Sequence, residues 1–212
     1  MHFHGQIGRT CLQALRSLIV VAFVGSPLVA GPTNVQAQPT EQQITDALLP
    51  LPEDLKADAT VVTYDPTTGA RQVLRQGANQ VECQPMDAEA MQTSCYSKTL
   101  APQFDLMARL RAEGKSPGEV QAGIVAARQS GTLTPPAFGS MMYALRHDDR
   151  RIKLLWVMMV PGATSEAVGV SMVSQRDNAL KGQGRPWLMR AGTPGAHIMI
   201  PINNTPLSSG VR

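Results

Sequence analysis

The order of the elements along the chain predicts an α+β fold: a single domain with an antiparallel sheet and a helical hairpin packed on it. Residues 59 to 83 are rich in β-branched residues and are interrupted by turn sequences, which is typical of short strands. Apolar residues recur at helical spacing between residues 104 and 131, and strand-like runs return from residue 141 to 201. Strands, then helices, then strands favour this class, because a parallel α/β sheet would need strands and helices to alternate throughout.

The first 37 residues predict a secretory signal peptide that precedes this domain. Arg9 and Arg16 give a positive start, an apolar run follows from residue 18 to 24, and Val35 and Ala37 fit the positions that a signal peptidase recognises. The apolar run is broken by Gly-Ser-Pro, well short of the roughly 20 residues that a spanning helix needs. We therefore expect cleavage after Ala37 and a mature protein that is periplasmic or secreted.

Composition narrows the class of partner that the mature chain can have. The predicted domain covers residues 38 to 202, and a loose tail covers residues 203 to 212. No second apolar run is long enough to form a transmembrane segment. Loss of the two leader arginines reduces the 19 Lys and Arg residues to 17, against 16 Asp and Glu, so the net charge falls from +3 to +1. Because no basic run interleaved with aromatics remains, no nucleic-acid partner is expected.

The mature chain begins with a predicted helix and three predicted strands. Thr40 and Gln43 form a capping box ahead of apolar residues at helical spacing, and Pro50 ends the helix. Turn sequences then separate the strands of a predicted antiparallel meander, at residues 59 to 64, 71 to 75 and 80 to 83.

Two helices and two strand pairs are predicted in the remainder of the domain. The first helix centres on residues 104 to 110, and the second starts at Ser116, with Pro117 in its first turn and Glu119 completing a capping box. These helices are expected to form the hairpin that packs on the sheet. The strands are expected to pair through a charged loop and a glycine-containing turn, at residues 141 to 146, 152 to 160, 187 to 190 and 196 to 201.

Two cysteines, Cys83 and Cys95, remain after the predicted cleavage, because Cys11 lies in the leader. In an oxidising compartment an even count predicts a disulfide first. The bond would close a short loop within the segment from residue 84 to 99, which is predicted to be a loop. A catalytic thiol or half of a metal site are the alternatives.

The C-terminal hairpin carries the sharpest candidate metal ligands. His197 and Met199 would share one face of a strand, with Met189 across the hairpin, and 7 of the 11 methionines lie at or after Met141. Thioethers with imidazole suit copper, especially Cu(I). The preferred interpretation is structural: methionine fills gaps in a core that is poor in aromatics, and the histidine bonds to a backbone carbonyl.

A His-dependent hydrolase is a weaker hypothesis. The sequence contains no phosphate-binding glycine loop, no G-x-S-x-G and no H-E-x-x-H motif. His147, beside Asp148 and Asp149, could act as a general base or contribute hard metal ligands, although a solvated hairpin tip explains this cluster as well. His197 could activate Thr193, but turn chemistry already accounts for Thr193.

Several short motifs resemble a group of uncharacterised exported bacterial proteins. The shared features are the leader, the cysteine pair, a Leu-Arg-x-Gly-x-Asn turn and a C-terminal hairpin of the type PW-x-M, GTP, AHIM: here Leu74, Arg75, Gly77, Asn79, Pro186 to Met189, Gly192 to Pro194 and Ala196 to Met199. The resemblance covers most of the mature chain and implies export and a single domain. It implies no activity, binding residue or cofactor.

The sequence therefore favours a binding module over an enzyme. Only two histidines remain in the mature chain, and no catalytic constellation is recognisable. We expect an exported, non-catalytic module that binds a small ligand or another envelope protein, with copper binding and hydrolysis as the alternatives and with no cofactor indicated.

Overall fold

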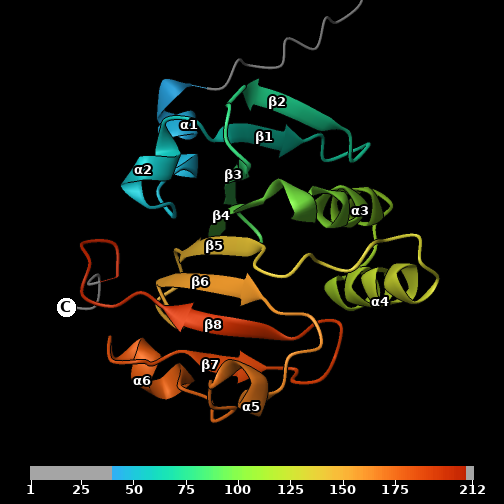
Figure 1. Ribbon diagram of the computed structural model, residues 1–212. Helices are drawn as coiled ribbons and strands as arrows, with labels where there is room; N and C mark the ends of the chain where they lie inside the picture. Colours follow the sequence, from blue (N-terminus) through green and yellow to red (C-terminus); the bar gives the residue numbers. More distant parts are fainter. Residues whose placement is uncertain (1–39, 209–212) are drawn as a thin grey trace, which may run out of the picture. The chain divides into compact units, whose positions relative to one another are not determined.

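An eight-stranded sheet in the order β2-β1-β3-β4-β5-β6-β8-β7 organises the residues that the computed structural model describes, 40 to 208 (Figure 1). Together with six α-helices, these residues confirm the predicted α+β class. They belong to the second of the two units into which the chain divides, Gln38–Arg212. The predicted signal peptide, residues 1 to 37, and the end of the predicted tail, residues 209 to 212, lie outside the described residues.

The strands are β1 (Thr60–Tyr64), β2 (Arg71–Arg75), β3 (Val81–Asp87), β4 (Gln92–Ser97), β5 (Met141–Arg146), β6 (Leu154–Met159), β7 (Trp187–Met189) and β8 (His197–Pro201). The helices are α1 (Glu41–Ala47), α2 (Glu53–Lys56), the 3-10 helix η1 (Lys98–Leu100), α3 (Ala101–Ala112), α4 (Pro117–Gln129), α5 (Ser165–Val168) and α6 (Arg176–Leu180).

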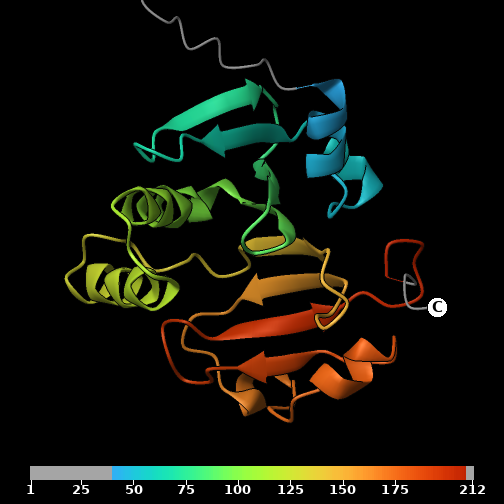
Figure 2. The same ribbon diagram turned by 180° about the vertical axis from the view of Figure 1, so that it is seen from behind.

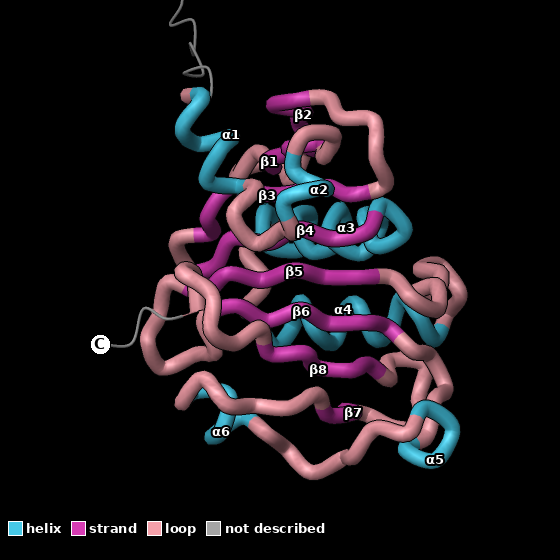
Figure 3. The backbone as a smooth tube through the Cα atoms, turned by 60° about the vertical axis from the view of Figure 1, so that its left-hand side comes forward, coloured by secondary structure: helices cyan, strands magenta, loops and turns pink. Residues whose placement is uncertain are grey.

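Helices lie on both faces of the sheet. In Figure 3, α3 and α4 pass behind the strands and α2 lies in front of them. The view from behind shows α3 and α4 beside one another, as predicted for the helical hairpin (Figure 2). Ser116 and Glu119 form the expected capping box at the start of α4, as Thr40 and Gln43 do at α1. Local signals thus set both helix starts.

The structure corrects the prediction for the first part of the sheet. Residues 84 to 99, predicted to be a loop, contain the end of β3 and all of β4, a central strand. The predicted meander also fails, because β3 passes to the other side of β1 and pairs with it in parallel, Thr60 opposite Glu82 and Val61 opposite Cys83. The signal of β4 is weak because its buried residues include hydroxyl side chains, which are not typical of a core strand.

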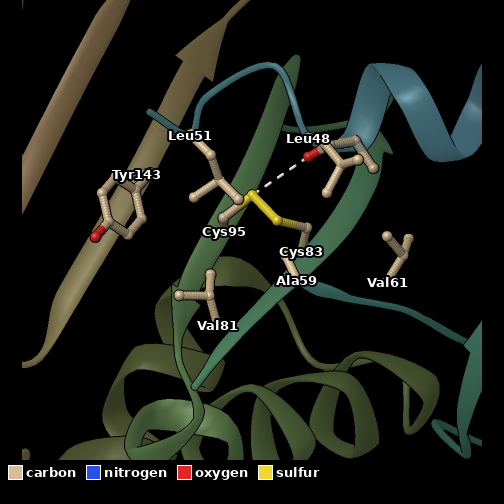
Figure 4. Packing of buried hydrophobic residues seen from close by; sticks show 9 residues of the cluster. Leu48, Leu51, Ala59, Val61, Val81, Cys83, Cys95 and Tyr143 are labelled. Atoms are coloured by element: carbon tan, nitrogen blue, oxygen red, sulfur yellow. Dashed lines mark hydrogen bonds between the residues drawn. A yellow bond between two sulfur atoms is a disulfide. The ribbon is translucent and has the colours of Figure 1, made fainter. Parts of the chain in front are cut away.

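The Cys83–Cys95 disulfide lies at the centre of the core on the α1 face (Figure 4). The two cysteines are directly opposite one another in β3 and β4, and neither is exposed. Leu48, Leu51 and Val61 pack around the bond. The dashed line in Figure 4 joins Cys95 Sγ to the carbonyl oxygen of Ala47, the last residue of α1, at 3.3 Å. This is a close contact and not a hydrogen bond, because a disulfide sulfur carries no hydrogen. The predicted disulfide is therefore present, and it joins paired strands rather than closing a loop.

The Leu-Arg-x-Gly-x-Asn turn after β2 holds the segment between α2 and β1. The Arg75 guanidinium donates to the carbonyls of Lys56 and Ala59, both at 2.7 Å, and the Asn79 side chain donates to another α2 carbonyl at 2.9 Å. A Cβ on Gly77 would lie 2.2 Å from the backbone oxygen of Asp58, so only glycine fits there. The motif behind the stated resemblance therefore has a structural role in this chain.

The C-terminal third forms two strand pairs, as predicted. A charged loop connects β5 to β6, and β7 pairs with β8 antiparallel. The segment between β6 and β7 contains the short helices α5 and α6, which were not predicted from the sequence. Val160, Leu188 and Ala196 form a separate core cluster under this segment. None of the helices described between residues 40 and 208 combines the length and apolar character needed to cross a bilayer.

Candidate functional site

The C-terminal hairpin brings the three predicted metal ligands onto one face of the sheet. His197 in β8 is directly opposite Met189 in β7, and Met199 lies two residues further along β8. The His197 Nδ1 atom lies 2.8 Å from the carbonyl oxygen of Gly195 and donates to it, so Nε2 is the ring nitrogen available as a metal ligand. This bond is the one expected of a structural histidine, and it also suits a ligand. Copper binding stays a prediction.

The residues proposed for hydrolysis are not arranged as a nucleophile with its base. His147 Nε2 lies 3.0 Å from Thr93 Oγ1, but Thr93 is only 2% exposed, so a substrate carbon cannot reach it. Thr193 donates to the Arg190 carbonyl at 2.8 Å and contacts its own turn rather than His197. Among residues 40 to 208, no group of three His, Cys, Asp or Glu side chains is placed to hold a metal ion.

A cleft of about 520 Å³ lies between α3 and the β1–β3–β4 part of the sheet, and we call it the α3 cleft. Its sides come from strands, from the two turns at their ends and from one helix face. The lining residues are Thr63 to Pro66, Gln84 to Asp87, Glu89, Ala90, Gln92, Ser94, Phe104, Met107, Ala108 and Arg111. Its volume falls within the range of small-molecule sites, about 300 to 1,000 Å³.

Gly69 closes one end of the α3 cleft by bringing the β1–β2 turn against the helix. A Cβ on Gly69 would lie 2.7 Å from the Cα atom of Arg109 in α3, and its φ of +69° is in the left-handed region. Glycine therefore allows both the turn and the close approach. At the other end, Arg111 Nη1 donates to Asp87 Oδ2 at 2.9 Å, which joins α3 to the β3–β4 turn.

A chain of hydrogen bonds runs from the floor of the cleft to α3. Gln84 Nε2 donates to the Tyr96 hydroxyl at 2.9 Å, and the Tyr64 hydroxyl donates to Asp105 Oδ1 at 2.8 Å. The two hydroxyl oxygens lie 3.5 Å apart. Because Tyr64 gives its hydrogen to Asp105, its oxygen is left to accept from Tyr96, and the donors all point toward one carboxylate. Tyr64 and Gln84, which line the cleft, are thus held in fixed positions.

The tyrosines of this chain remain protonated at neutral pH. Burial raises the pKa of Tyr96 to about 12, and its ring stacks on Phe104 with centroids 3.8 Å apart. Burial, followed by the neighbouring Tyr96 and Asp105, raises the pKa of Tyr64 further above its ordinary value. A tyrosine that resists ionisation is a hydrogen-bond donor rather than a nucleophile or base. The hydrogen-bond chain therefore orients the side chains that it joins and does not activate them as nucleophiles or bases.

An ion pair between the buried Glu82 and the partly exposed Arg71 adjoins the hydrogen-bond chain. Glu82 is 5% exposed and accepts from Arg71 Nη2 at 2.5 Å. Its second oxygen, Oε2, is buried and has no hydrogen-bond partner among the residues that the structure describes. Removing Arg71 would leave a buried charge uncompensated, which is strongly destabilising. The pair ties the edge strand β2 to β3 across β1.

Comparisons with known proteins add no identity to this geometry. No family model matches the chain, and neither does any curated protein or solved structure. The resemblance to exported bacterial proteins stays a prediction. The α3 cleft was not predicted from the sequence because its polar residues, such as Tyr64, Gln84 and Arg111, are far apart along the chain, and β4 between them was not recognised.

Proposed function

We propose that this chain is an exported, non-catalytic module that binds a small ligand in the α3 cleft. The observation that carries the proposal is the cleft itself: a volume of about 520 Å³ in which Tyr64 and Gln84 are preoriented by partly buried hydrogen bonds. Preorientation lowers the entropic cost of binding, because these side chains do not have to be ordered by the ligand.

The lining of the cleft favours a neutral or cationic ligand with an apolar face. Phe104, Met107 and Met86 supply apolar surface. Three acidic residues line the cleft, Asp65, Asp87 and Glu89. The one basic lining residue, Arg111, is already paired with Asp87. An anion would therefore meet uncompensated carboxylates at the mouth of the cleft.

Native mass spectrometry of the protein recovered from the envelope of producing cells tests the proposal. We expect a retained small molecule on the wild-type protein and its loss in Ala108→Trp, which fills the cleft from α3. Ala126→Trp is the matched control, because Ala126 is exposed on α4 and does not line the cleft. Retention of the same mass by Ala108→Trp, with native circular dichroism, would place the ligand elsewhere. Turnover of an ester, peptide or phosphate substrate that is lost in His197→Ala would favour the hydrolase instead.

A further inference from the structure

A second pocket lies at the C-terminal hairpin, on the face of the sheet that also carries the α3 cleft. We call it the arginine pocket. It measures about 530 Å³ and combines an apolar wall with several guanidinium groups. Its lining residues are Arg146, Arg151, Ile152, Leu155, Met172, Ser174, Arg176, Trp187, Leu188, Met189, Arg190 and Met199. Met189 and Met199, two of the predicted copper ligands, thus line this pocket, whereas His197 does not.

The charge of the arginine pocket is entirely of one sign. Four arginines line it and no aspartate or glutamate does. Among the described residues none of these four forms an ion pair; Arg146 and Arg176 make only long hydrogen bonds to backbone carbonyls, at 3.3 and 3.4 Å. The nearby Asp148 and Asp149 are paired instead with Arg150 and Lys153. The pocket therefore presents positive charge that no carboxylate in its lining neutralises.

The electrostatics of individual groups agree with this excess. Burial, and then repulsion by Arg151, lowers the pKa of Arg146, with Asp148 and Asp87 partly offsetting the effect. Burial and repulsion by Arg190 likewise lower the pKa of Arg128 on α4, whose Nε atom is buried without a partner among the described residues. An anion bound in the pocket would relieve both repulsions.

The backbone at Arg190 adds an independent observation. Its φ of 54° is in the left-handed region, which glycine occupies at little cost and other residues occupy uncommonly. The same turn also contains Gly192, a residue that adopts the left-handed region at little cost, so a non-glycine residue at position 190 stands out. Sparsely populated backbone conformations cluster at ligand-binding sites, and Arg190, which is in one, lines the pocket.

The apolar part of the pocket lining indicates that the ligand has an apolar part besides its anionic group. Trp187 and Leu155 form part of its wall on the sheet, and Met172 and Met189 at its edge are 59% and 40% exposed. Exposed apolar side chains beside arginines match a molecule with an apolar body and an anionic end. The guanidinium group holds a carboxylate through two parallel hydrogen bonds. We propose that the arginine pocket binds a small amphipathic anion, a carboxylate carried on an apolar chain.

Dodecanoate below its micellar concentration is the probe, and Trp187 is the reporter. The chain contains two tryptophans, and Trp156 lies on the other face of the sheet, where its Nε1 donates to the Pro50 carbonyl at 3.1 Å. In a Trp156→Phe background, dodecanoate should change the emission of Trp187 saturably. Acetate, which lacks the chain, should not, and the neutral dodecyl maltoside should bind about tenfold more weakly.

Arginine variants test the charge requirement. Arg151→Gln and Arg190→Gln should each weaken dodecanoate binding about tenfold, the effect of losing a hydrogen bond between charged groups. Arg185→Gln is the matched control, because Arg185 is an exposed arginine two residues before Trp187, forms no ion pair among the described residues and does not line the pocket. Its affinity should stay within about twofold of wild type. Circular dichroism and thermal melting verify that each variant folds.

Three outcomes would overturn the proposal. Equal affinity for dodecanoate and dodecyl maltoside would show a purely apolar pocket. Unchanged binding in both Arg151→Gln and Arg190→Gln would place the anion elsewhere. Association with vesicles that contain anionic lipid, without binding of monomeric dodecanoate, would indicate a membrane surface as the partner rather than a small molecule.

Discussion

The disulfide offers the most quantitative test of the fold. We expect Cys83→Ala/Cys95→Ala to destabilise the protein by about 3 kcal/mol, the chain-entropy value for cross-linking residues 12 apart. The β3–β4 hairpin that the bond joins is local, so residual pairing in the unfolded chain would lower this figure. For a domain of this size the loss corresponds to a fall in melting temperature of roughly 6 to 12 °C.

Urea unfolding followed by tryptophan fluorescence measures the change, with intact-mass analysis to verify the bond. The reduced wild type is the matched comparison: it should unfold close to the variant, and reductant should leave the variant unaffected. A loss below about 1 kcal/mol would refute the reasoning, because the bond would then restrict the unfolded chain very little. Two free thiols in protein from an oxidising compartment would contradict the disulfide itself.

The same variant also probes the α3 cleft. Cys83 precedes Gln84, and Cys95 precedes Tyr96, so the bond fixes the spacing of two residues that are hydrogen-bonded to each other at 2.9 Å. We therefore expect ligand retention to weaken in the variant at temperatures where it is still folded. Full retention would show that strand pairing alone holds the floor of the cleft.

The remaining predictions concern a titration, a cap, an export signal and a metal. Burial raises the pKa of Tyr96 from 10.0 to about 12, so folding favours the protonated hydroxyl. The stability that this shift contributes is complete below pH 10 and is lost as the pH rises toward 12. Tyrosinate absorbance with parallel circular dichroism tests this loss, and native protein in which Tyr96 is ionised at pH 10 would contradict it. Ser116→Ala should destabilise the protein by about 1 kcal/mol in urea unfolding because Glu119 loses its capping partner. Intact mass of envelope protein should show cleavage after Ala37, and retention of the apolar leader would reject export. If copper binds, stoichiometric Cu(I) should appear in native mass spectra and disappear in His197→Ala, whereas protein indifferent to Cu(I) would exclude this alternative.

The features predicted correctly are those with local signals. The capping boxes at Thr40 and Ser116 and the β5–β6 hairpin each depend on residues close together in sequence. The parallel pairing of β1 with β3 has no such signal, because it depends on the path of the chain around β2. The strand β4 was missed since Thr93, although 2% exposed, is polar and forms its contact with His147.

The two pockets illustrate the same limit for function. The histidine and methionines of the C-terminal hairpin were recognised by residue type, and two of the three line a pocket. The arginines that give this pocket its charge come from β5, from the loop before β6, from α6 and from the turn after β7. Only the folded sheet brings these groups together, so no spacing in the sequence marks them.

The hydrogen bond from Trp156 to Pro50 joins residues 106 apart, so this contact forms only when both ends of that long segment are present. The helix α1 packs on β3 and β4, and the segment after it reaches β6 through this bond, so the first core cluster is completed only once two thirds of the domain is available. Such long-range closure makes folding slow compared with that of helical bundles. For a chain that crosses a membrane unfolded, as the leader predicts, late closure would keep the amino-terminal half loose until the carboxy-terminal strands arrive.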